Sequence, residues 1–278
     1  MRVVVVGATG NLGTSVLRSL EKEESVESVL GLARRLPGLS MPKVEWASAD
    51  VVDEDLVPHF RGADAVVLLA WLIQPSRDLT KQWMVNVEGS TRVARAAKEA
   101  GVPSLLYASS VGAYSAGPKD RRVDESWPTT GITTSFYSRH KAEVERLLDR
   151  FEDEHERTRV VRLRPGLIFK REAASGIRRL FAGPLLPGSL LRPALIPVVP
   201  DVSRLVFQAV HSHDVGEAYR LALLGDASGP FNIAADPIID PAELGRILDA
   251  RTVPMSAGAL RAAAAVSYKL RLQPSEPG

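Results

Sequence analysis

The sequence has 278 residues, of which 45% are hydrophobic and 24% charged, and these ordinary values exclude a chain that is disordered throughout. A net charge of +2, with basic residues scattered along the chain, argues against nucleic acid as a partner. The absence of cysteine excludes disulfides, thiolate metal sites and a cysteine nucleophile, and we expect a cytoplasmic protein.

The first half of the chain alternates short β-branched runs with helical patterns. Strands are expected at residues 2–6, 26–33, 44–48, 65–69, 104–109 and 159–163, and helices at 11–22, 83–100 and 136–155. This alternation is typical of βαβ units. It predicts an α/β fold with a doubly wound parallel sheet of roughly six or seven strands, the Rossmann arrangement, in a nucleotide-binding domain over residues 1–165.

The pattern loosens after residue 165. Glycine and proline are frequent between residues 166 and 202, and helical patterns return at 216–224 and in the alanine-rich segment 258–265. We expect residues 166–278 to form a smaller substrate-binding region, interleaved with late elements of the sheet. The last residues, 273–278, have the composition of a linker. A chain truncated there could bind cofactor while lacking part of its substrate pocket.

No segment fits a membrane span. The apolar residues 3–6 meet glycine far short of the roughly 20 residues that a spanning helix needs. Prolines and Arg192 interrupt the apolar residues 180–200, for which a substrate-side loop or cap is expected. The expected partner is therefore a small-molecule substrate, with neither membrane nor nucleic acid.

A glycine-rich turn follows the first strand directly. Gly7 suits the tight strand-to-helix turn, Gly10 lets backbone N–H groups approach a pyrophosphate, and Gly13 permits close packing of helix on strand. In this context the turn predicts a bound dinucleotide, although a plain strand–helix turn is the alternative. Cofactor contacts are expected from Gly7, Thr9, Gly10, Asn11, Leu12 and Gly13.

The end of the second strand bears on the choice between NAD and NADP. An NAD site of this type carries an acid for the ribose 2′-hydroxyl about 20 residues after the turn. Arg34 and Arg35 stand there instead, and guanidinium groups favour the 2′-phosphate of NADP. NAD remains open, because an exposed arginine pair is also common on loops. Asp50, followed by Val51, is expected to face adenine, or else to cap a turn.

Candidate acid–base residues lie farther along the chain. Tyr137 and Lys141 are four residues apart, hence on one helix face, and a nearby ammonium lowers the pKa of a phenol. Ser109 and Ser110 end a strand at the edge where ligands bind in open α/β sheets. One of these hydroxyls is expected to orient a substrate oxygen and the other to shape the turn.

Taken together, these motifs resemble the extended short-chain dehydrogenase/reductases of the NAD-dependent epimerase/dehydratase family. The resemblance covers roughly residues 1–235, and its motifs are far more specific together than singly. They are Gly7-Ala8-Thr9-Gly10-Asn11-Leu12-Gly13, Ser109-Ser110-Val111-Gly112-Ala113-Tyr114, Tyr137-Ser138-Arg139-His140-Lys141, Arg162-Leu163-Arg164-Pro165-Gly166 and Val210-His211-Ser212-His213-Asp214-Val215.

The resemblance implies a role for each matched residue. Tyr137 would be the acid–base, Lys141 would hold the nicotinamide ribose and lower the pKa of Tyr137, and Ser110 would polarise the substrate oxygen. Asn86 would support the lysine through water, with a helix-surface residue as the alternative. The remaining cofactor contacts implied are Leu69 and Ala70 beside adenosine, Ser109 at the strand end, and Pro165 past the nicotinamide.

Two departures from the family pattern narrow the chemistry. Val111 and Gly112 stand where dehydratases of the group carry an acidic pair, which disfavours sugar dehydration. Residues 194–201 lack the polar clamp typical of sugar-nucleotide epimerases. The apolar residues 180–206 would suit a less polar substrate, or else pack in the core.

The leading hypothesis from the sequence is an NAD(P)-dependent oxidoreductase. One alternative is a sugar-nucleotide epimerase without net redox. The other is a non-catalytic dinucleotide sensor or scaffold. The resemblance also makes a homodimer an expected assembly.

Overall fold

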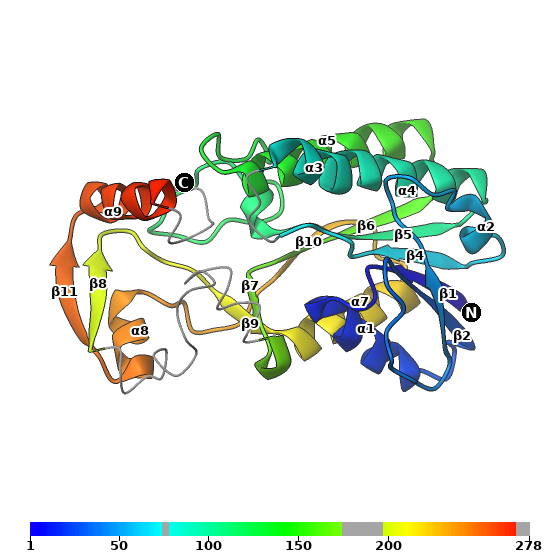
Figure 1. The fold of residues 1–278 in the computed structure, drawn as a ribbon, viewed down its shortest axis with the longest axis horizontal. Helices are drawn as coiled ribbons and strands as arrows, with labels where there is room; N and C mark the ends of the chain where they lie inside the picture. Colours follow the sequence, from blue (N-terminus) through cyan, green and yellow to red (C-terminus); the bar gives the residue numbers. More distant parts are fainter. Residues whose placement is uncertain (74–77, 174–196, 271–278) are drawn as a thin grey trace.

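The computed structural model describes residues 1–73, 78–173 and 197–270. Its centre is a seven-stranded parallel sheet in the order β10-β6-β5-β4-β1-β2-β3 (Figure 1). The expected α/β fold with a Rossmann-type sheet is confirmed. The strands are β1 (Arg2–Val6), β2 (Ser28–Ala33), β3 (Val44–Ser48), β4 (Ala65–Leu68), β5 (Ser104–Ala108), β6 (Arg159–Pro165) and β10 (Gly229–Ile233).

Helices cover both faces of this sheet (Figure 1). On one face lie α2 (Val57–Phe60), α3 (Leu79–Trp83), the π-helix η1 (Met84–Glu88), α4 (Gly89–Glu99) and α5 (Phe136–Glu154). On the other face lie α1 (Asn11–Glu21) and α7 (Ser212–Leu224), which pack against each other. The central strands β1, β4 and β5 are largely apolar on both faces, as expected for a parallel sheet covered on both sides.

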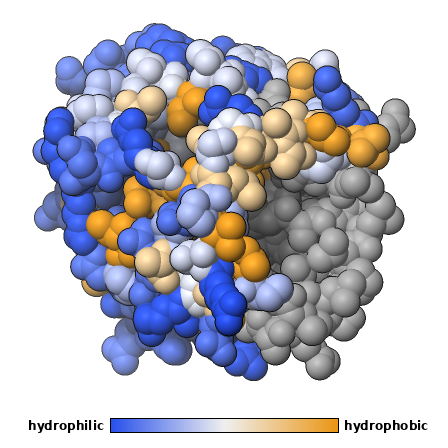
Figure 2. Space-filling view, turned by 90° about the vertical axis from the view of Figure 1, so that its left-hand side faces the viewer, coloured by the Kyte–Doolittle hydropathy of each residue, from blue (hydrophilic) through white to orange (hydrophobic). Residues whose placement is uncertain are grey.

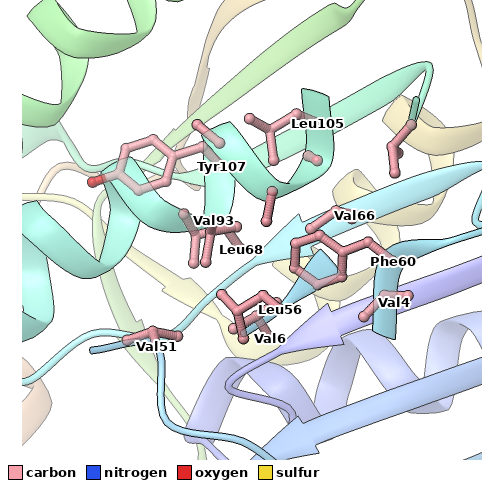
Figure 3. Close-up of a cluster of buried hydrophobic side chains, with 14 of the residues drawn as sticks. Val4, Val6, Val51, Leu56, Phe60, Val66, Leu68, Val93, Leu105 and Tyr107 are labelled. Carbon is pink, nitrogen blue, oxygen red and sulfur yellow. The ribbon is translucent and has the colours of Figure 1, made fainter. Parts of the chain in front are cut away.

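Each face has its own core. Figure 3 shows the cluster beneath α2 and α4, where the fully buried Phe60 lies beside Val4 and Val66 of the sheet. The opposite cluster joins Val16 and Leu17 of α1 to Val215 and Tyr219 of α7, all fully buried. These two apolar layers fix the sheet, and with it the loops at the ends of its strands.

Parallel pairing brings the carboxyl ends of the strands to one edge. Val6 at the end of β1 pairs with Leu32 of β2 on one side and Leu68 of β4 on the other. The strand order reverses between β1 and β4, and ligands of open α/β sheets bind at such a switch point. The chain leaves this edge at the glycine turn, Arg34, Leu69 and Ser109, so the sheet itself gathers most of the expected site residues.

A smaller region lies beyond β6. Here β7 (Leu167–Phe169) pairs with β9 (Ala209–His211), and β8 (Val198–Val202) pairs with β11 (Arg251–Met255) beside α8 (Pro241–Leu248) and α9 (Ala257–Lys269). Polar and apolar side chains are interspersed over this end of the molecule (Figure 2). All five residues of β11 are exposed and α9 buries none, so this end adds little to the core.

Some elements differ from the sequence expectation. The helix expected at 83–100 begins at Leu79 and contains the π-helical turn η1, an insertion that apolar periodicity does not reveal. The strands β7, β8, β9, β10 and β11 were not located from the sequence. Proline or glycine interrupts or flanks the apolar runs of all of them except β9, which has only three residues. The interpretation of residues 180–206 falls mostly outside the described residues. Over the described ranges, no helix has the length and apolar character to cross a membrane.

Candidate active site

The glycine turn forms a cradle with no room for side chains. Gly7 has a φ of +87°, and a Cβ there would lie 2.6 Å from the backbone nitrogen of Ala70. A Cβ on Gly13 would lie 2.5 Å from the carbonyl oxygen of Ala8. Gly10 caps α1 without any side-chain hydrogen bond, so its own position offers no side chain to the first-turn N–H groups. The turn therefore fits a pyrophosphate, which helix N-termini bind.

The residues expected around the adenosine differ in exposure: two are exposed, one makes a turn contact and one packs in the core. Arg34 and Arg35 are exposed just after β2. The Asp50 carboxylate accepts a hydrogen bond from the Val52 backbone nitrogen at 2.9 Å, which is the turn contact that the sequence left as the alternative. Val51 is buried, and a Cβ on Gly89 of α4 would lie 2.6 Å from its side chain, so Val51 packs in the core.

Tyr137 lies in the first turn of α5, next to Ser110. Burial raises the pKa of the phenol, and a hydrogen bond with Ser110 acts in the opposite direction. Ser110 also accepts a hydrogen bond from the Gly112 backbone nitrogen at 3.0 Å, so one hydroxyl both faces the tyrosine and shapes the turn. A Cβ on Gly112 would lie 2.9 Å from the Tyr137 ring. Only glycine fits there without displacing the tyrosine, which accounts for the lack of an acid at this position.

The Lys141 ammonium contacts Trp71 and the end of β5 more closely than Tyr137, which the sequence did not lead us to expect. Its ammonium is buried, donates to the Ala108 carbonyl oxygen at 2.5 Å and to the Tyr107 hydroxyl at 3.2 Å, and lies 3.4 Å from the centre of the Trp71 ring. The centre of the Tyr137 ring is 5.8 Å away. Lys141 was expected to lower the pKa of Tyr137; instead burial dominates that pKa, because the ammonium faces Trp71 and the end of β5.

Asn86 anchors the loop that carries Trp71. It is fully buried, so it is not the helix-surface residue kept as the alternative. Its side chain accepts from the Leu72 backbone nitrogen at 2.7 Å and donates to the Leu72 carbonyl oxygen at 3.2 Å, and its amide lies 3.4 Å from His140 Nδ1. Its contacts thus hold the loop whose Trp71 ring lies over Lys141.

Ser109 and the end of β6 belong to a buried polar cluster. The Ser109 hydroxyl donates to Glu145 of α5, so it points into the protein rather than toward the cofactor turn. Arg164 donates to the same carboxylate, with both contacts at 2.9 Å, and to the Tyr114 hydroxyl at 3.0 Å. Pro165, at the end of β6, pairs with Ile233 of β10, and the chain enters β7 two residues later at Leu167.

Three residues in or beside the site were missed by sequence reasoning. Trp71 directly follows the expected Leu69 and Ala70, and Glu145 stands four residues after Lys141 on the same helix face, so both had a positional signal. Lys170 had none. Its buried ammonium donates to Thr14 Oγ1 at 2.8 Å and Ser15 Oγ at 3.2 Å, and so lies beside the first turns of α1.

Comparison with known proteins identifies the family. A sequence model of the NAD dependent epimerase/dehydratase family matches residues 3–183, well over half of the chain. The chain belongs to this family. The resemblance inferred from the motifs is thus confirmed, and the family is one of NAD-dependent enzymes.

Individual proteins match this chain at low sequence identity. A Mycobacterium tuberculosis protein described as uncharacterized is 27% identical over 264 residues, which make up 94% of this chain and 25% of that protein. The chain thus spans a quarter of that relative's length. The 3-beta-hydroxysteroid dehydrogenase of Mycolicibacterium neoaurum is 26% identical over 53% of this chain and 42% of its own.

Solved structures share the fold. The UDP-glucuronic acid 4-epimerase of Bacillus cereus, solved in complex with NAD, matches with a TM-score of 0.74 and 17% identity, over 92% of this chain and 87% of that chain. At this identity the likeness establishes the architecture and leaves substrate and chemistry to be argued from the site.

Proposed function

We propose that the protein is an NAD(P)-dependent oxidoreductase acting on a hydroxyl or carbonyl carbon, with Tyr137 as its acid–base. The observation that carries the proposal is the juxtaposition of the Tyr137 ring and Ser110 Oγ, both of which lie against Gly112 at the same sheet edge as the glycine cradle. The cofactor, when bound, supplies or accepts the hydride at nicotinamide C4. The residues of this chain bind it, orient the substrate oxygen and move the accompanying proton.

Each polar residue of the site has a defined task in this proposal. The Ser110 hydroxyl orients the substrate oxygen toward Tyr137 Oη, which donates a proton in reduction and accepts one in oxidation. Because burial raises the pKa of Tyr137, the phenol is protonated at neutral pH and ready to donate in reduction, whereas oxidation requires the phenolate and is favoured at higher pH. Lys141 supplies an ammonium that would hold the nicotinamide ribose, which requires its Trp71 face to open or the ribose to approach beside it.

The cofactor contacts follow from the cradle and its surroundings. Uncapped N–H groups of Asn11 and Leu12 would hold the pyrophosphate. We add Lys170, because its buried ammonium has hydroxyl partners beside the same helix turn and suits a phosphate. The exposed Arg34 and Arg35 favour the 2′-phosphate of NADP, and direct titration with NAD and NADP tests this preference.

The experiment is a turnover assay followed by nicotinamide absorbance. The protein is incubated with NAD or NADP and a panel of secondary alcohols that includes a 3-beta-hydroxysteroid and UDP-sugars. Stoichiometric cofactor reduction supports the oxidoreductase, and product formed without net cofactor change would make the protein an epimerase. Tyr137→Phe should abolish turnover while sparing cofactor affinity, and unchanged turnover would remove Tyr137 from the mechanism. Cofactor binding without turnover on any substrate would favour the sensor.

The homodimer is likewise a proposal. Leu79, Trp83 and Met84 expose apolar surface, with Leu79 53% exposed. A groove between α3 and α5 is lined by residues that include Leu79, Trp83, His140 and Glu143, and neither Tyr137 nor Lys141 belongs to its lining. A second copy packing here would cover this surface without closing the site. Sedimentation analysis of the wild type against Trp83→Ser tests it, with a monomeric wild type as the contrary result.

A further inference from the structure

We propose that Glu145 is a positioning residue of this site: its buried carboxylate fixes the strand end that carries Ser110 and balances the ammonium charge of Lys141. The proposal concerns the same site as the proposed function and rests on it for the meaning of those two residues. The charge on Lys141, however, is a property of the protein without cofactor and can be tested separately.

The burial and contacts of Glu145 set it apart from an ordinary helix carboxylate. Its side chain is 0% exposed in the middle of a helix whose other acids mostly face solvent. Arg164 contacts both of its oxygens at 2.9 Å, and Arg162 contacts one of them at 3.1 Å. A buried carboxylate with this many charge-assisted hydrogen bonds stays ionised, and these partners hold the pKa of Glu145 below its usual value despite burial.

The carboxylate also ties together the three segments that build the site. It belongs to α5, which carries Tyr137 and Lys141. It accepts the hydroxyl of Ser109, the residue next to Ser110, at the end of β5. Through Arg164 it reaches the end of β6 and, one bond further, the Tyr114 hydroxyl, which donates to Asn232 Oδ1 of β10 at 2.7 Å. Loss of this hub would free Ser110 to move relative to α5.

The second effect is electrostatic. Lys141 is buried, which pushes the pKa of its ammonium well below the usual value, and the charge of Glu145 one helix turn away opposes that shift. The other groups around the ammonium are neutral at physiological pH. They are the Tyr107 hydroxyl and Ala108 carbonyl of β5, the Trp71 ring of the loop after β4, and Tyr137 of α5.

The groups around the Glu145 carboxylate are Ser109, Arg162 and Arg164, with Asp149 and Glu152 on the outer side of Arg162. Among the groups that the structure describes around Lys141, Glu145 is thus the acid whose charge favours the ammonium form against the effect of burial.

A purely structural ion pair would predict something different. Replacing Glu145 would then lower stability but leave the titration of Lys141 where it was. The charge-balancing role predicts that Glu145→Gln, which keeps the shape and removes the charge, moves that titration to lower pH. Glu143→Gln on the same helix is the matched control, because Glu143 is partly exposed and pairs with Arg146 on another face.

The test is an NMR titration of isotope-labelled lysine side chains in the cofactor-free protein, with Lys141 assigned by its loss in Lys141→Arg. In Glu145→Gln the Lys141 midpoint falls by about one pH unit, a tenfold change in proton affinity, and in Glu143→Gln it does not move. A midpoint equal to that of the wild type in Glu145→Gln overturns the proposal. Glu145→Asp, which keeps the charge but withdraws it by one methylene, gives a smaller shift in the same direction and serves if the glutamine variant does not fold.

Cofactor affinity as a function of pH separates this inference from the proposed function. NAD and NADP binding should weaken at lower pH in Glu145→Gln than in the wild type, while ADP, which lacks the nicotinamide ribose, should bind both equally. A wild type that binds neither NAD nor NADP would sink the proposed function and leave the Lys141 titration to decide the role of Glu145. If NAD affinity depended on pH in the same way in Glu145→Gln and the wild type, this result would count against the charge-balancing role of Glu145.

Discussion

Replacing Gly13 by alanine tests whether the glycine turn is as tight as described. Gly13 is the third residue of α1, and an alanine Cβ there would lie 2.5 Å from the Ala8 carbonyl oxygen and 2.6 Å from the Gly7 carbonyl oxygen. Carbon contacts are optimal near ~3.5 Å, so the methyl group would be about 1 Å too close. Both obstacles are backbone atoms of the cradle, and relief requires α1 to move away from β1.

Two opposing effects set the size of the change. Alanine in place of glycine within a helix stabilises by roughly 0.5–1 kcal/mol. Overpacking against a rigid neighbour costs about 1–3 kcal/mol, and backbone neighbours place Gly13 at the upper end of that range. We expect a net loss of about 2–2.5 kcal/mol in the free energy of unfolding. At roughly 2–4 °C per kcal/mol for a domain of this size, the melting temperature would fall by several degrees.

The assay pairs urea unfolding with calorimetric titration of NAD and NADP. Gly13→Ala should lose stability and most of its dinucleotide affinity, because the displaced turn no longer presents its N–H groups. Gly258→Ala in α9 is the control, since a Cβ there would meet nothing within 4 Å. It should keep wild-type affinity and gain slightly in stability. A Gly13→Ala protein with wild-type affinity would refute the cradle.

Three further changes probe other parts of the site. Gly112→Ala should keep the fold but reduce turnover about tenfold to hundredfold by displacing the Tyr137 ring, whereas full activity would show that the ring yields freely. Burial lowers the pKa of His140 below 6.5, so the unfolded chain binds its proton more readily and stability falls as pH drops through that value. In urea unfolding from pH 7 to pH 5, His140→Gln should lose less stability than the wild type; parallel curves would contradict this. Lys170→Met should weaken NADP and ADP binding but not adenosine binding, and equal losses for adenosine would point to a structural role instead.

The sequence was informative wherever residue type alone determines geometry. Four consecutive valines ending at Gly7 identified a buried strand and its turn, because β-branched residues and glycine have narrow conformational preferences. The alternation of strands and helices then predicted the sheet, and the sheet placed Arg34, Ser109 and the glycine turn at one edge. Spacing along α5 likewise put Tyr137 and Lys141 on one helix face.

The remaining features depend on contacts between distant segments. Nothing local in the sequence shows that Trp71 covers the Lys141 ammonium, or that Asn86 holds the Trp71 loop by its backbone. The same holds for Ser109, whose hydroxyl has two plausible directions until the position of Glu145 is known. The expected lowering of the Tyr137 pKa failed for this reason: spacing gives the helix face but not the direction of a long side chain.

A crystal structure of the protein with bound NADP would show directly whether the glycine turn and Tyr137 serve one cofactor. We expect the pyrophosphate on the backbone N–H groups of Asn11 and Leu12, the 2′-phosphate beside Arg34 and Arg35, and the nicotinamide within reach of Tyr137 and Lys141. A dinucleotide bound elsewhere, or one whose nicotinamide turns away from Tyr137 while Trp71 still covers Lys141, would contradict this expectation.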